Sequence, residues 1–155
     1  MKSNNITFIG LLLCIVTTFA LLGCNDSKYG DSNIEIGRGE MYHFAHQGNL
    51  VNTIRAKVTL KHTSGPPVTL YIMDEANWKL CQINGPDGIA NMLAGDSTTL
   101  KPQPVYTFSA NLSQQETDWI DIPIRDNVFF VISQNTGNSK EKSKCSARIA
   151  VKIAD

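Results

Sequence analysis

Apolar and polar residues alternate strictly along residues 54–61, which read Ile-Arg-Ala-Lys-Val-Thr-Leu-Lys. Successive side chains of a β-strand point to opposite faces of a sheet, so this pattern gives the strand one apolar face and one polar face. The alternation returns in the last segment, where Cys145, Ala147, Ile149 and Val151 share one face. Both segments are therefore predicted to be strands with one side in a core and the other side in water.

Two further segments, residues 68–73 and 128–132, are apolar at nearly every position, which is typical of central strands that are covered on both sides. Three less regular segments, 40–45, 105–112 and 119–124, complete a set of about seven or eight strands. Turns rich in Gly, Pro, Asn and Asp separate the strands, and no segment has the sustained period of a long helix. The pattern predicts an all-β fold, an antiparallel β-sandwich of the immunoglobulin-like or jelly-roll kind.

The size and charge of the chain narrow the prediction further. Its 155 residues, of which 42% are hydrophobic, suffice for one core and are too few for two. The 14 basic residues equal the 14 acidic ones, so the totals predict neither nucleic acid nor any other broad electrostatic partner.

Residues 74–80 contain good helix formers after Asp74, a residue type that commonly caps helices, and a single helical turn is predicted there.

The N-terminus has the pattern of an export signal. Lys2 precedes residues 6–22, an uncharged apolar run of 17 residues. This length is at the short end of what spans a bilayer, and no cluster of Lys or Arg follows it, so a retained transmembrane anchor is the weaker alternative. The run ends in Leu21-Leu22-Gly23-Cys24, which resembles the bacterial lipobox, where a small residue precedes the cleaved bond and the next cysteine is acylated.

The lipobox resemblance implies that residues 1–23 are a lipoprotein signal peptide and that acyl groups such as palmitate are attached to Cys24. Two or three acyl chains anchor a protein stably to a membrane. Residues 24–33 are polar and contain Gly and Ser, so a lipidated cysteine and flexible stalk are predicted before a single domain of residues 34–155. By the same resemblance, Asn25 after the cysteine favours the outer membrane over the inner membrane.

Export also bears on the remaining cysteines. Cys14 leaves with the signal peptide and Cys24 carries the lipid, which leaves Cys81 and Cys145 as one pair in an oxidising compartment. A disulfide between these two is predicted, with Cys145 on the core face of its strand. In the chain-entropy view, closing a loop of this size would stabilise the fold by about 4 kcal/mol.

No motif in the chain indicates catalysis or a cofactor. The G-x-S-x-G and H-E-x-x-H patterns are absent, and no catalytic residue, metal or cofactor is predicted. His43 and His46 are close in sequence, but at this spacing on a strand they point to opposite faces and cannot reach one ion. Trp78, Tyr106 and Trp119 are candidates for stacking on a ligand such as a sugar, although aromatic residues of small β-sandwiches more often belong to the core.

The order of segments resembles that of the pre-peptidase C-terminal modules of secreted bacterial proteins, where strands similar to Val68–Asp74 and to Phe129-Phe130-Val131 recur. Those modules are accessory and non-catalytic. The prediction is a lipid-anchored cell-envelope protein with a binding or structural role, whose partners are the membrane, through the N-terminal lipid, and another envelope protein or a glycan. The alternative is a small envelope enzyme or enzyme inhibitor with its site on residues 82–100, a long connection of the kind that frequently carries function.

Overall fold

A computed structural model describes residues 27–48, 52–83, 106–111, 113–134 and 140–154. These residues form nine strands and one helix, in the order β1 (Ser27–Ile36), β2 (Met41–His46), β3 (Ile54–Ser64), β4 (Val68–Asp74), α2 (Glu75–Ile83), β5 (Tyr106–Ala110), β6 (Gln114–Glu116), β7 (Ile120–Ile122), β8 (Val128–Gln134) and β9 (Ser143–Ile153).

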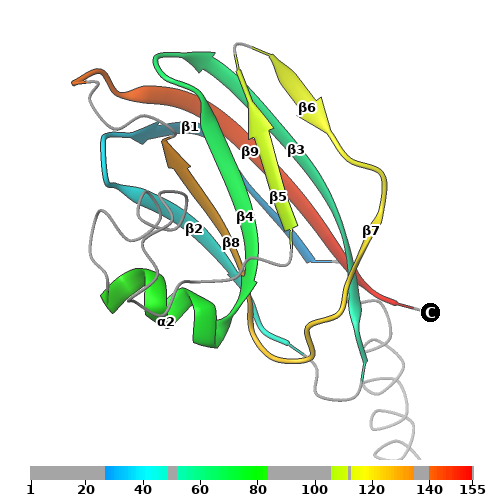
Figure 1. The fold of residues 1–155 in the computed structure, drawn as a ribbon. Coiled ribbons are helices and arrows are strands. Elements are labelled where there is room, and N and C mark those ends of the chain that lie inside the picture. The colour runs from blue at the N-terminus through cyan, green and yellow to red at the C-terminus, as the bar shows by residue number, and fades with distance from the viewer. Residues whose placement is uncertain (1–26, 49–51, 84–105, 112, 135–139, 155) are drawn as a thin grey trace, which may run out of the picture.

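The strands build two antiparallel sheets that pack face to face (Figure 1). The first sheet has the order β1-β9-β3-β6, and β7 pairs with the other end of β3. The second sheet has the order β2-β8-β4-β5. The predicted all-β antiparallel sandwich is therefore confirmed.

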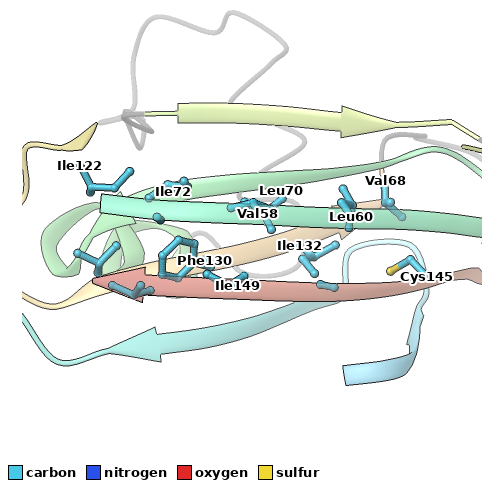
Figure 2. Packing of buried hydrophobic residues seen from close by; sticks show 14 of the residues in the cluster. Val58, Leu60, Val68, Leu70, Ile72, Ile122, Phe130, Ile132, Cys145 and Ile149 are labelled. Carbon is cyan, nitrogen blue, oxygen red and sulfur yellow. The ribbon is translucent and has the colours of Figure 1, made fainter. Parts of the chain in front are cut away.

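The core lies between the sheets and is supplied by the apolar faces that the alternation predicted. From the first sheet, Val58 and Leu60 of β3 and Ile149 of β9 point inward, and they meet Leu70 of β4 and Phe130 of β8 (Figure 2). The polar residues between them, on both long strands, point to the opposite side of the sheet. The first sheet thus has one dry face and one face open to solvent.

The central strands of the second sheet, β4 and β8, are covered on both sides, which explains why they are continuously apolar. Tyr71, Met73 and Val131 point away from the sandwich core and pack under α2, whose Trp78 and Cys81 complete a second, smaller cluster. Helix α2 has nine residues, longer than the predicted single turn. Its N-terminus is capped as predicted, because the Asn77 backbone N–H donates to the Asp74 carboxylate over 2.8 Å.

The predicted flexible stalk is wrong for residues 27–33, because they form most of β1 and pair with β9 from Ser27 opposite Val151. Polar composition does not prevent this pairing, since an edge strand uses only its backbone groups to join a sheet and leaves its outer side chains in water. Tyr29 points inward and packs on the core, while Lys28 is exposed. Residues 24–26 lie outside the described part of the chain.

Three strands near the edges also differ from the prediction. The short strand β6 was not predicted, because its three residues, Gln114–Glu116, are all polar and exposed. The segments predicted over 105–112 and 119–124 are confirmed only in part, as β5 and β7.

Gly65, in the turn between β3 and β4, is required by both conformation and space. Its φ is positive, at 81°, and a Cβ atom there would lie 2.3 Å from the Lys142 carbonyl oxygen. We expect Gly65→Ala to lower the free energy of unfolding by more than about 2 kcal/mol, measured by urea denaturation. Gly39→Ala, at a φ of 70° in the turn before β2, is the control and should cost about 1 kcal/mol. Equal losses would contradict the close approach at Gly65.

Candidate functional site

Part of the predicted site lies outside the described residues. Cys24, the predicted site of lipidation, and residues 84–100 of the long connection are among them. Residues 82 and 83 belong to the end of α2. The backbone of Tyr106 pairs with Ile72, but its side chain is also outside the described part.

Trp78 is not available as a stacking platform. Its side chain is only 7% exposed, and its ring stacks on Phe129 with the centroids 5.5 Å apart and the planes 19° apart. His43 lies against the same indole, with a centroid distance of 4.7 Å. The prediction of Trp78 as a ligand-binding residue is therefore corrected, because the tryptophan fixes α2 to the second sheet.

Trp119 is half-buried just before β7, and the Lys152 ammonium lies 4.9 Å from its ring centroid. This is the geometry of a cation–π contact. Trp119, one of the three aromatic residues predicted to bind a ligand, thus lies beside the open face of the first sheet. Its ring is already in contact with Lys152 of the same chain.

The predicted disulfide is absent, since Cys81 and Cys145 are both free thiols. Cys145 lies in the core between the sheets (Figure 2), whereas Cys81 lies under α2 on the other side of the second sheet. The prediction that Cys145 lies on the core face of its strand is thus confirmed. Cys81 belongs to α2 and therefore lies on the outer face of the second sheet. The Cys81 thiol contacts the Met73 sulfur at 3.7 Å. Burial raises the pKa of each thiol to about 11.

His43 and His46 lie on opposite faces of β2, as predicted. His43 stacks on Trp78 outside the sandwich, and the His46 Nδ1 atom lies 2.8 Å from the Tyr29 hydroxyl on the inner side. Burial lowers the pKa of His46, so the neutral form is favoured. Within the described ranges, no three His, Cys, Asp or Glu side chains are placed to share a metal ion.

The open face of the first sheet carries the largest set of functional groups, and sequence analysis missed it. Its basic side chains come from β1, β3 and β9, at the positions that alternate with the core residues. We call this surface the basic face; its basic members are Lys28, Arg55, Lys57, Lys61, Lys144, Arg148 and Lys152, and its acidic members are Glu35, Glu116 and Asp121. The signal was present in the sequence, because the polar positions of the alternating strands are mostly Lys or Arg.

Three ion pairs account for all three acids of the basic face. The Arg55 guanidinium lies 2.9 Å from Asp121, the Lys57 ammonium 2.6 Å from Glu116 and the Lys144 ammonium 3.0 Å from Glu35. The hydrogen bond from Lys144 and its charge lower the pKa of Glu35, and the hydrogen bond to Glu116 raises the pKa of Lys57. These pairs are largely exposed, so each adds little to stability.

Lys28, Lys61 and Arg148 remain without an ion pair to any acid in the described part of the chain. They line a shallow hollow of about 850 Å³ on the basic face, together with Thr59, Ser146 and two acidic residues, Asp31 and Glu116. The register explains how they meet: Arg148 of β9 lies opposite Gly30 of β1, next to Lys28, and opposite Thr59 of β3 on its other side. The hollow offers ammonium, guanidinium and hydroxyl donors, the groups that bind anionic oxygen atoms.

The fold separates charge that the sequence totals hide. Seven of the chain's 14 basic residues, but only three of its 14 acidic ones, lie on the basic face. Counted over these strand residues, the basic face has a formal charge of +4, and the rest of the chain, with seven basic and eleven acidic residues, has −4. Asp118, whose charge acts on Lys57, and Asp31, which lines the hollow, are outside this count. Balanced totals therefore do not describe the charge of this surface, and the absence of a broad electrostatic partner stays a prediction.

Comparison with known proteins leaves the function open. No protein-family model matches the chain, and no curated protein matches it. Weak structural likenesses exist to a periplasmic lysozyme inhibitor of g-type lysozyme from Aeromonas hydrophila (7% identity, 84% of this chain and 90% of that chain, TM-score 0.43) and to a Bacillus endospore appendage pilus protein (15% identity, 84% and 92%, TM-score 0.39). A third is to the VP2 protein of infectious bursal disease virus (12% identity, 82% and 32%, TM-score 0.37). At these TM-scores no function is carried over from them. No helix in the described residues is long and apolar enough to cross a membrane.

Proposed function

We propose that this chain is an exported cell-envelope protein, acylated on Cys24, that binds a partner without catalysis, and that the basic face is its binding surface. The N-terminal pattern that ends in Leu21-Leu22-Gly23-Cys24 supports export and acylation. An outer-membrane location and the relation to pre-peptidase C-terminal modules are part of the same hypothesis and rest on the sequence resemblances alone.

The observation that carries the binding role is the set of cations on the basic face that have no ion pair with an acid among the residues described by the structure. Lys28, Lys61 and Arg148 come from three different strands, yet the pairing of β1, β9 and β3 brings them to one hollow. On the other sheet, α2 packs over Tyr71, Met73 and Val131 of the outer face. A surface of fixed cations and hydroxyl groups on a rigid sheet suits recognition of an anionic partner.

The proposed binding role is tested by neutralising these cations. We expect Lys28→Gln, Lys61→Gln and Arg148→Gln together to weaken binding of residues 25–155 to a purified envelope fraction by about a hundredfold, because each cation near an anionic surface contributes about fivefold. Co-sedimentation measures the binding. The matched control removes three exposed cations elsewhere, with Arg38→Gln, Arg125→Gln and Lys140→Gln. Equal loss in both triple variants would show that total charge, and not the basic face, determines binding.

The alternative, an enzyme inhibitor or small enzyme that acts through residues 82–100, predicts the opposite dependence. Replacing residues 86–98 with a short Gly-Ser linker should then abolish binding, while the neutralised basic face should leave it intact. Under our proposal the linker variant binds the envelope fraction as the unaltered chain does. The two hypotheses are therefore separated by the same co-sedimentation measurement.

A further inference from the structure

From the position of β1 and the separation of charge, we propose that the basic face lies against the anionic phospholipid headgroups of the membrane in which the protein is anchored. This inference rests on the proposed acylation of Cys24. It goes beyond the proposed function because it names the partner of the basic face and the orientation of the domain.

The first step is the length of the tether. Strand β1 begins at Ser27, three residues after Cys24, so the two Cα atoms are at most about 11 Å apart even in a fully extended chain. Lys28 is one residue farther, within about 14 Å of the same point. A stalk of ten residues would have allowed the domain to stand about 30 Å away. Because β1 pairs with β9 from its first residue, the edge of the first sheet stays at the membrane surface.

The second step is the choice of face. A domain held this close can turn one sheet or the other toward the membrane, and charge distinguishes them. The basic face has a formal charge of +4, while the rest of the chain after Cys24, without Lys2, has six basic and eleven acidic residues. The screening length at physiological salt is about 8 Å, so cations act on the headgroups only when the basic face is turned to them. Anionic headgroups attract the basic face and repel the remaining surface.

The third step is the chemistry of the hollow. Lys28, Lys61 and Arg148 line the hollow with ammonium and guanidinium groups, and Thr59 and Ser146 add hydroxyls. The two acidic residues of the same hollow, Asp31 and Glu116, already have partners, because the Tyr42 hydroxyl donates to Asp31 and Lys57 pairs with Glu116. Lipid phosphates accept hydrogen bonds from each of these groups, and Arg binds phosphate in a bidentate manner. The other cations of the basic face are already held by an acid or by Trp119. The three cations that have no acidic partner within the described ranges are therefore those expected to contact lipid.

The test attaches residues 24–155 to vesicles through the Cys24 sulfur with a maleimide lipid. All described strands and the helix lie within these residues, so the fold is retained. Cys81 and Cys145 are buried and their thiols do not compete for the reagent. Lysine acetylation followed by mass spectrometry then compares vesicles of pure phosphatidylcholine with vesicles that contain 30% phosphatidylglycerol, a fraction on the order of that in anionic membranes.

We expect Lys28 and Lys61 to be acetylated at least about fivefold more slowly on the anionic vesicles, and this protection to disappear in about 1 M salt, where the screening length falls to about 3 Å. Lys79, on α2, and Lys140 are the internal controls and should react equally on both vesicles. Equal rates at Lys28 and Lys61, or protection of Lys79 instead, would overturn the inference. Protection of Lys28 and Lys61 that appears only when an acidic envelope polymer is added would also overturn the inference. That result would mean that the basic face binds a macromolecular anion and not lipid headgroups.

The vesicle experiment and the proposed acylation fail independently. Chemical attachment replaces the cellular lipid, so a negative footprint leaves the acylation of Cys24 untouched. If the protein in the cell kept residues 1–23, the proposed anchoring would be wrong, even if Lys28 and Lys61 were protected from acetylation on the vesicles.

Discussion

Phe130→Ala is expected to lower the free energy of unfolding by about 3–5 kcal/mol, because the ring is fully buried between the two sheets. Phe130 lies on β8 between Phe44 of β2 and Ile72 of β4, so the backbone on both sides is fixed and the cavity cannot close easily. Urea denaturation of the two proteins measures the difference.

The neighbouring Phe129 is the matched control for this prediction. It points to the opposite face of β8, is only half-buried and packs against Trp78. Phe129→Ala should therefore cost clearly less than Phe130→Ala. Because a shift of one residue exchanges the two faces of a strand, the reverse order of stabilities would show that the register of β8 is wrong.

Stability is expected to fall steeply with alkaline pH because the two buried thiols remain protonated in the folded state. Burial raises the pKa of Cys81 and of Cys145 from 9.0 to about 11. Between these values the unfolded chain loses the thiol protons while the folded chain keeps them. The stabilisation is thus fully present below pH 9 and is lost as pH rises toward 11, by about 1.4 kcal/mol per pH unit for each thiol.

Urea denaturation between pH 8 and pH 11, under reducing conditions, checks this pH dependence. The double variant Cys81→Ala and Cys145→Ala should be less stable at pH 8 and should show a shallower decline above pH 9. Burial also raises the pKa of Tyr71, so a smaller slope remains in the variant. An unchanged slope in the double variant would mean that the thiols do not cause the decline.

The fold could be predicted where side chains alone decide the structure. Alternation fixed β3 and β9, since their apolar residues have only one dry face to occupy. The continuous apolar run of β4 showed that both of its faces are covered, but it did not show that α2 covers one of them. Strand β1 was missed because backbone pairing at a sheet edge leaves almost no mark on composition.

The candidate site could not be predicted because it depends on register between distant strands. Lys28, Lys61 and Arg148 are far apart in sequence, and only the pairing of β1, β9 and β3 places them around one hollow. The sum of charges gave zero and concealed their separation. The disulfide was wrongly predicted for the same reason, because strand periodicity placed Cys145 in the core while the turn into α2 moved Cys81 to the other side of the sheet.

Acylation of Cys24 is the claim on which both the anchoring and the membrane-facing orientation depend. Intact-mass measurement of the protein extracted from the membrane fraction tests it directly, with Cys24→Ala as the control that should accumulate as a precursor with residues 1–23 attached. We predict a chain that begins at Cys24 and carries the added mass of two or three acyl chains. A chain that retains residues 1–23, or one that begins near Cys24 without acyl mass, would contradict the account.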